Sequence, residues 1–175
     1  MYTIGDLVIY SSHGICRITD ICEKTYSGIT RTYYVMHPIE NNNLLLNLPV
    51  DHADGIIQRL LNRKEAEEIL HSFTKPGMEW PEKNQDRIRM YSAIIKTGDR
   101  MEIAKIINTI MRKQNDAERN GKKLGESERK ILMSTQHILF KELSILMGVP
   151  IEAIAEQVDL LMQQSSEASY GLQRD

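Results

Sequence analysis

The residues with the most distinctive chemistry lie in one stretch, residues 79–100 (EWPEKNQDRIRMYSAIIKTGDR), which contains the only tryptophan of this 175-residue chain. Trp80 is followed by three cations, Lys83, Arg87 and Arg89. An aromatic ring beside cations suits nucleic acid, because the cations neutralise phosphates while the ring wedges against unstacked bases. The same residues also suit a structural role, in which Trp80 covers the end of a hydrophobic core and the cations form a solvated helix face. The pattern alone leaves both interpretations open.

This stretch is predicted to form an amphipathic helix that packs on a core. Pro81 is favoured at the first helical position, because the N–H that proline lacks is not needed there. Apolar residues then recur at helical spacing, at Ile88, Tyr91, Ile94 and Ile95. Trp80 falls near Tyr91 on the helical wheel, so its ring could point inward. Gly98 is predicted to end the helix and Asp99 to cap the next one.

The charge of the chain is small overall but unevenly distributed. The formal net charge is −2 and the isoelectric point is about 6.2, which argues against binding of nucleic acid through bulk positive charge. Residues 1–58 carry three Lys/Arg and six Asp/Glu, a net charge of −3. Residues 83–130 carry 13 Lys/Arg and seven Asp/Glu, a net charge of +6. Because local charge governs encounter more than the total does, the two regions suggest two different partners.

Several classes of protein are disfavoured. No apolar run reaches the length of a membrane span, and the N-terminus lacks a signal sequence. Cys16 and Cys22 are too few for a disulfide framework, which favours reduced thiols in a cytosolic protein, and the five histidines have no metal-ligand spacing. Asp116 and Glu118 lie close together but suit solvated helix charges, and no nucleophile elbow, P-loop, dinucleotide-binding turn or HExxH motif is found. We therefore expect neither an enzyme nor a cofactor or metal.

The first fifty residues have the composition of short strands. Apolar, β-prone runs at residues 4–10, 15–23, 30–39 and 44–48 are separated by turn residues, among them Gly14, Gly28 and three consecutive asparagines. This spacing predicts a small β-barrel or curled sheet of four or five strands. A sheet of that size leaves an edge exposed unless a partner pairs with it. Residues 50–58 are expected to be a connector.

The remainder is predicted to be helical. Asn62 and Glu65 resemble a capping box ahead of an apolar stripe, and Asp99 with Glu102 repeats that logic. Further helices are predicted over 127–147 and 151–162, the first of them ended by Gly148. The fold class is therefore α+β, with a small β module followed by a bundle of about five helices. The predicted domains are residues 1–55 and 56–163, followed by a polar tail at 164–175 that is expected to be flexible.

Several segments, in this order and spacing, resemble the CarD (CdnL) family of bacterial transcription regulators. They are IGDLVIYSSHGICRITDI, the strand TYYVM, LLLNLPVDHAD, IIKTGD and LGESERKILMSTQHILFKEL. The resemblance extends to about Ile154. The N-terminal part of that family is shared with the RNA-polymerase-interacting domain of the transcription-repair coupling factor.

The resemblance implies a Tudor-like N-terminal module that binds the β subunit of bacterial RNA polymerase. In the family one strand pairs edge to edge with the polymerase, and the matching residues here are Leu45, Leu46, Asn47 and Leu48. Lys24 stands where the family often has a basic contact. Asn47 stands where the compared family member has arginine, so a charged contact to the polymerase is expected to be missing or moved.

The resemblance also implies that the helical domain contacts promoter DNA. The family places a tryptophan in the minor groove at the upstream edge of the melted bubble. A count back from Gly98 without gaps puts that position at Asn84, whereas a small local insertion would return the role to Trp80. The implied phosphate contacts are Lys83, Arg87, Arg89, Arg129 and Lys130, with Lys122 and Lys123 nearby, and Ser134 stands near a basic position of the family.

The expected function is regulation of transcription through stabilisation of the open promoter complex. DNA would be contacted without regard to sequence, by a monomer that is cytoplasmic and associated with the nucleoid through RNA polymerase. One alternative is a polymerase-bound adaptor that binds proteins without touching DNA. Another is an RNA-binding module, because small barrels of this kind recur in ribosomal proteins.

Overall fold

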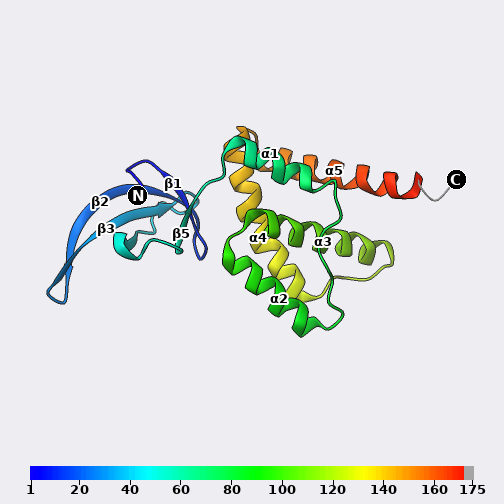
Figure 1. Ribbon diagram of the computed structural model, residues 1–175, viewed down its shortest axis with the longest axis horizontal. Coiled ribbons are helices and arrows are strands. Elements are labelled where there is room, and N and C mark those ends of the chain that lie inside the picture. The colour runs from blue at the N-terminus through cyan, green and yellow to red at the C-terminus, as the bar shows by residue number, and fades with distance from the viewer. Residues whose placement is uncertain (172–175) are drawn as a thin grey trace. The chain divides into compact units, whose positions relative to one another are not determined.

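The computed structural model describes residues 1–171, and their side chains as far as residue 164. The chain forms two compact units, residues 1–60 and the residues from Leu61 onward (Figure 1). The first unit contains strands β1 (Leu7–Tyr10), β2 (Gly14–Tyr26), β3 (Ile29–Pro38), β4 (Leu46–Pro49) and β5 (Ile57–Arg59), with a 3₁₀ turn at Val50–His52. The second contains helices α1 (Arg63–Ser72), α2 (Asn84–Thr97), α3 (Arg100–Arg119), α4 (Glu126–Met147) and α5 (Ile151–Gly171). The predicted α+β class, with strands before helices, is confirmed.

The first unit is one antiparallel sheet of five strands in the order β4-β3-β2-β1-β5. The long β2–β3 hairpin turns at Ser27 and Gly28, which have φ angles of 50° and 77°. Two consecutive left-handed residues give the tight turn whose twist matches that of the strands. An irregularity in the β2–β3 pairing between Ile18 and Asp20 bends β2, and Figure 1 shows the resulting curvature. Strand β5 lies where the sequence predicted only a connector.

One face of the curved sheet encloses a small core. Its buried members are Val8, Cys16, Ile18, Tyr34, Met36, Leu48, Ala53 and Ile57. Burial raises the pKa of the Cys16 thiol to about 11, so this thiol stays protonated and unreactive at neutral pH. The outermost strands of the sheet are β4 and β5. The expected exposed edge is therefore present at β4, although this strand begins at Leu46 rather than at residue 44.

The helix ends follow the capping residues of the sequence with one exception. Asn62 and Glu65 form a complete capping box on α1, and the Asp99 side chain accepts the Glu102 N–H at the start of α3. Gly98 and Gly148, both in the left-handed conformation, end α2 and α4. The prediction of Pro81 at the first position of α2 is wrong, because that helix begins three residues later, at Asn84. Trp80 therefore lies in the connection between α1 and α2.

The core of the second unit is built from all five helices, and two ion pairs with buried carboxylates on α4 join them. Arg87 of α2 pairs with Glu128 of α4, and Arg100 of α3 pairs with Glu142 of α4 at 3.4 Å. Glu142 also accepts the backbone N–H of Leu61 at 2.7 Å, so it fixes the first residue of this unit.

The stripes predicted for α1 and α3 are largely buried, whereas the buried polar residues Asn108 and Thr109 were not anticipated. Helix α5 continues to Gly171, and the rest of the predicted tail lies outside the described residues.

Replacement of Glu142 by glutamine is predicted to remove a pH dependence of folding. Burial raises the pKa of Glu142, while Arg100 and the Leu61 N–H oppose this rise only in part. The folded state therefore binds a proton at Glu142 more readily than the unfolded state does. The stabilisation that this protonation gives is complete below the unfolded pKa of Glu142 and is lost as pH rises through its folded pKa. The difference in unfolding free energy, wild type minus Glu142→Gln, should fall as pH rises from about 4, near the unfolded pKa. Urea unfolding of both proteins at a series of pH values from about 4 upward measures this difference. A difference that grows with pH would contradict the prediction.

Candidate nucleic-acid interface and sheet edge

Residues 73–83, which connect α1 to α2, form a loop that carries Trp80 and is held along its length by side chains of α2 and α3. We name this segment the Trp80 loop. Asn108 of α3 donates to the Lys75 carbonyl at 2.8 Å, and the Thr109 hydroxyl accepts the Met78 N–H at 2.7 Å. Gly77 lies so close to α3 that a Cβ there would overlap the Thr109 side chain. The loop is thus packed onto the helices rather than projecting freely from them.

Trp80 is half-buried, and its ring lies between the core and several cations. It packs against the core of the second unit and meets the Tyr91 ring edge to face, with 6.4 Å between centroids. The Arg87 guanidinium carbon lies 4.1 Å from the Trp80 ring centroid, and the Lys113 ammonium lies 5.3 Å from it. The structural interpretation of Trp80 therefore holds, whereas the nucleic-acid interpretation stays a prediction. The ring covers the end of a core, and cations lie against it.

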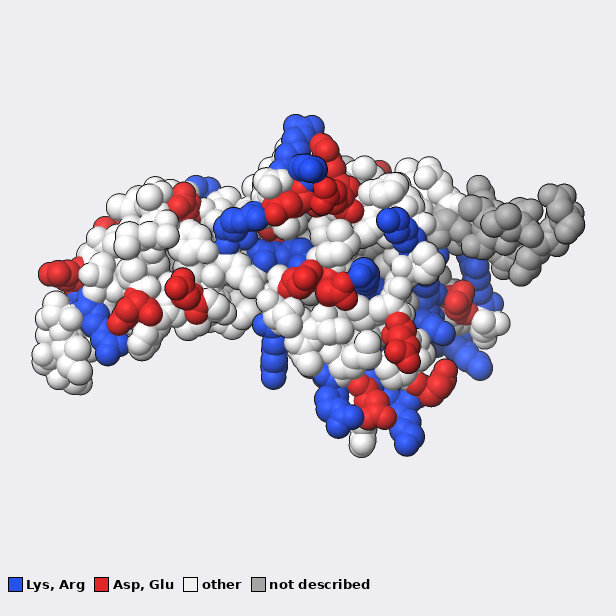
Figure 2. Space-filling view, in the orientation of Figure 1, with Lys and Arg blue, Asp and Glu red and all other residues white. Residues whose placement is uncertain are grey.

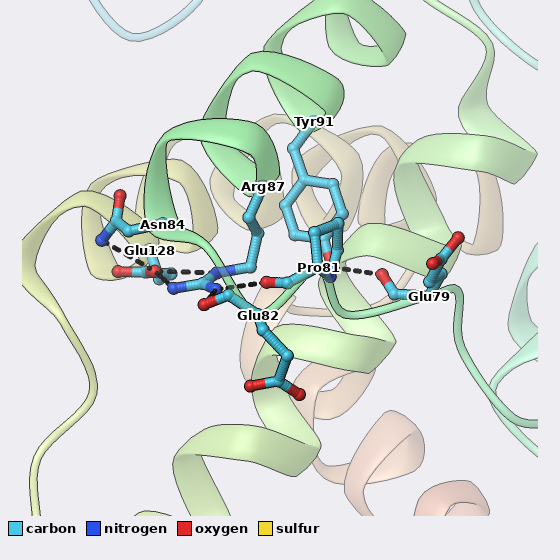
Figure 3. A network of polar contacts seen from close by, with 7 residues as sticks. All are labelled: Glu79, Pro81, Glu82, Asn84, Arg87, Tyr91 and Glu128. Atoms are coloured by element: carbon cyan, nitrogen blue, oxygen red, sulfur yellow. Dashed lines mark hydrogen bonds and ion pairs between the residues drawn. The ribbon is translucent and has the colours of Figure 1, made fainter.

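Arg87 is not a surface cation. Only 7% of the residue is exposed, and the guanidinium is paired with Glu128, of which 1% is exposed. The same side chain donates to the carbonyls of Pro81 at 2.6 Å and of Glu82 at 3.3 Å (Figure 3). Its hydrogen-bonding groups are directed into the protein, so the geometry makes Arg87 a support of the Trp80 loop rather than a phosphate contact.

The other predicted contacts differ in how free their charges are. Lys83 is exposed and precedes α2, whereas the exposed Arg89 pairs with Asp86 at 3.0 Å. On α4, Lys130 pairs with Glu126 at 3.0 Å. The remaining exposed cations of the predicted set and its neighbours are Arg129, Lys122 and Lys123, and none of them pairs with an acidic side chain of residues 1–164. Asn84 is exposed, and its side-chain nitrogen lies 3.4 Å from Glu128 Oε1.

Lys113 is a candidate that the sequence did not reveal. It lies 33 positions after Trp80, and only the packing of the Trp80 loop on α3 brings the two side chains together. Figure 2 shows that on the visible face of the second unit Lys and Arg are interspersed with Asp and Glu. Such a surface favours contacts of modest strength with phosphates over strong binding by charge alone.

The outer strand β4 presents the residues predicted to contact a protein. Leu45, just before the strand, is 49% exposed, and Asn47 is exposed, whereas Leu48 is buried in the sheet core. Leu46 is half-buried and packs against the same core. Lys24 of β2 donates to the Asn47 side-chain oxygen at 2.7 Å across the intervening strand β3. Leu48 can therefore offer a partner only its backbone, while Lys24 and Asn47 form one polar group beside the edge.

Comparison with known proteins identifies the family. Residues 2–61 match the family described as CarD-like/TRCF RID domain, and residues 68–159 match the family described as CarD, C-terminal domain. The chain belongs to the CarD family. Its first unit is thus an RNA-polymerase-interacting domain, the meaning of RID, and CarD-family regulators are transcription factors without enzymatic activity.

A curated relative supports the assignment over most of the chain. This CarD-family chain is 26% identical over 150 residues to a protein of Bacillus subtilis (strain 168) described as "Putative transcription factor YdeB". The match covers 85% of this chain and 94% of the relative. Among the side chains described, those of residues 1–164, no cluster of His, Cys, Asp and Glu could hold a metal ion. The helices described in this range include none long and apolar enough to cross a membrane.

Proposed function

We propose that the protein binds the β subunit of RNA polymerase through the β4 edge and stabilises open promoter complexes through Trp80. In this proposal the Trp80 ring contacts the minor groove at the upstream edge of the melted DNA. The observation that carries it is the placement of the only tryptophan on an anchored loop, half-buried, with the Lys113 ammonium 5.3 Å from its ring. A ring held beside a cation is suited to stack on a base while the cation meets a phosphate.

The polymerase contact is supported by the position of β4 in the sheet. An outer strand presents unpaired backbone groups, to which a strand of another protein can add by β-augmentation. Backbone bonds would supply affinity, and the side chains of Leu45, Asn47 and Lys24 would supply specificity. Asn47 stands where the compared family member has arginine, and Lys24 donates to the Asn47 side chain. In this proposal Lys24 therefore supplies the basic group that the arginine supplies in that family member.

Lys24 is therefore predicted to carry the charged part of the polymerase contact. Lys24→Ala should weaken binding to the β subunit by about 1 kcal/mol, the upper end for an exposed ionic contact, which is about fivefold in Kd. Arg31→Ala is the matched control, because Arg31 lies opposite Lys24 in the β2–β3 register but lies 3.9 Å from Asp51. Titration of the β subunit with each variant measures the effect, and equal losses from the two substitutions would contradict this assignment.

The DNA contact would act by shifting an equilibrium. Unstacking a base step costs a few kcal/mol, and an inserted or abutting ring offsets part of that cost. A protein that binds melted promoter better than closed promoter shifts the ratio towards the open complex, by about tenfold for each 1.4 kcal/mol of preference. Attachment to the polymerase raises the effective concentration of the Trp80 loop at the DNA, so the contact can be weak and independent of sequence.

The structure favours Trp80 over Asn84 for this role. Asn84 has a short amide side chain, with its nitrogen 3.4 Å from buried Glu128, and it offers no flat surface for a base. We assign the phosphate contacts to Lys83, Lys113 and Arg129. Arg89 and Lys130 would contribute less, because each is already paired with a neighbouring carboxylate.

One observation favours the adaptor without DNA contact. Glu79 and Glu82 are exposed on either side of Trp80, and carboxylates repel phosphates. A protein partner with basic groups would suit these acidic residues equally well.

The lifetime of the open complex on a promoter, with the polymerase of the same organism, tests the proposal and separates it from the adaptor. Added protein should lengthen the lifetime, and the gain should shrink steeply with added salt, because phosphate contacts release counterions. The variant Lys113→Gln should reduce both the gain and its salt dependence. If the protein binds polymerase but leaves the lifetime unchanged at low salt, the adaptor is the better description.

A further inference from the structure

We infer that Arg87 and Glu128 are positioning residues for Trp80, forming a buried ionic pin between α2 and α4 that sets where the ring is presented. The functional consequence of the pin rests on the proposed function, whereas its effect on the ring does not.

The backbone on either side of Trp80 is bonded to side chains of α2. The carbonyl before it, that of Glu79, accepts the Tyr91 hydroxyl at 2.8 Å. Burial raises the pKa of Tyr91 to about 12, so this hydroxyl remains a donor at neutral pH. The two carbonyls after Trp80, those of Pro81 and Glu82, accept Nη1 of Arg87 (Figure 3). Side chains of α2 therefore fix the chain both before and after the ring.

Arg87 is itself held by Glu128 of α4. Its Nε donates to Glu128 Oε1 at 2.9 Å, and its Nη2 donates to the same oxygen. Glu128 in turn has little freedom, because it is 1% exposed and its carboxylate occupies the space where a Cβ on Gly125 would lie. The orientation of the guanidinium is thus set by Glu128 of α4.

The planar shape of the guanidinium lets Arg87 make several contacts at once. Arg87 bonds a carboxylate with Nε and Nη2, bonds two loop carbonyls with Nη1, and lies 4.1 Å from the Trp80 ring centroid. A planar group with five fixed donors can make these contacts together, whereas the compact ammonium of lysine cannot. The pin therefore predicts that even Arg87→Lys, which keeps the charge, loosens the Trp80 loop.

The effect of the Arg87–Glu128 pair on the Trp80 ring can be separated from its effect on folding by replacing both partners with apolar side chains. A buried ion pair replaced by apolar side chains of similar volume often leaves stability unchanged or raised. Such a replacement removes the donors to the Pro81 and Glu82 carbonyls, so it should free the ring without unfolding the unit. A ring held in place before binding also avoids the entropy loss of being ordered on the DNA.

The test uses the fluorescence of the protein, since Trp80 is its only tryptophan. The full chain carrying Arg87→Met with Glu128→Leu is compared with wild type by acrylamide quenching, emission maximum and anisotropy. The matched control is Arg100→Met with Glu142→Leu, which removes the other ion pair that has a buried carboxylate on α4. The control lies far from the Trp80 ring, because Arg100 is 13 residues before Lys113 on α3, about 20 Å along the helix axis, and Lys113 lies against the ring.

We expect the Arg87/Glu128 variant to show a larger quenching constant, emission at longer wavelength and lower anisotropy, with the control unchanged. Arg87→Lys should change these signals in the same direction and serves as the test if the double variant does not fold. If the folded double variant shows the quenching, emission and anisotropy of wild type, the claim that Arg87 and Glu128 position the Trp80 ring is wrong. If the double variant is unfolded, wild-type signals in Arg87→Lys contradict the claim in the same way. A freed ring with a full gain in open-complex lifetime would support the pin and overturn Trp80 as the DNA contact.

Discussion

The variant Trp80→Ala is expected to lose most of the gain in open-complex lifetime while it still binds the polymerase. Stacking of a base on an aromatic side chain contributes about 1–3 kcal/mol. That range corresponds to about fivefold to somewhat over a hundredfold in the ratio of open to closed complex. Lifetimes measured at one salt concentration, with protein added to saturate the polymerase, report the loss.

Two further variants make this result specific. Asn84→Ala should keep most of the gain, because the structure gives Asn84 no flat surface for a base, and Trp80→Phe should recover part of it. Since Trp80 also packs on the core, unfolding of each variant is measured in parallel to show that the helical unit is intact. Loss of the gain in Asn84→Ala but not in Trp80→Ala would assign the contact to the position found by the gap-free count.

The variant Glu128→Ala is expected to show a large loss of stability. It leaves the Arg87 charge buried without its carboxylate, and loss of one partner of a buried pair costs about 3–5 kcal/mol. No described group donates to the second carboxylate oxygen, Oε2, which makes Arg87 the chief compensation of the Glu128 charge. The free energy of unfolding, from urea titrations followed by circular dichroism, measures the loss.

A neighbouring ion pair provides the control for this prediction. Glu126 lies two residues earlier on the same helix and pairs with Lys130, but their side chains are 70% and 73% exposed. Glu126→Ala should therefore change the unfolding free energy by less than about 1 kcal/mol. Similar losses in the two variants would show that burial of the Arg87–Glu128 pair does not set its contribution.

Local signals in the sequence were sufficient for most of the fold. The capping residues Asn62 and Asp99 and the glycines at positions 98 and 148 mark helix ends through contacts within a few residues, and all four act as predicted. The alternation of strands and turns likewise predicted the sheet and its exposed edge. Strand β5 was missed because it is three residues long and is defined by its pairing with distant β1.

The site was predicted less well, because its geometry depends on contacts between distant residues. Pro81 is compatible with the start of a helix, but Arg87 and Tyr91 bond the carbonyls around it in a loop that is not helical. Arg87 looked like a surface cation because its partner, Glu128, lies 41 residues away. The proximity of Lys113 to Trp80 likewise depends on loop packing that no local pattern records. Residue types drew attention to this stretch, and tertiary contacts decided where each of its side chains lies.

Photocrosslinking from position 80 tests the central claim, contact between the Trp80 loop and promoter DNA, most directly. The photoreactive residue p-benzoylphenylalanine replaces Trp80, Asn84 or, as a control, exposed Lys96 at the far end of α2. Each protein is assembled with polymerase on an end-labelled promoter and irradiated. The proposal predicts a crosslink from position 80 to nucleotides at the upstream edge of the bubble, with little or none from position 96. Crosslinks from position 80 to polymerase alone, in complexes shown to be open, would contradict it.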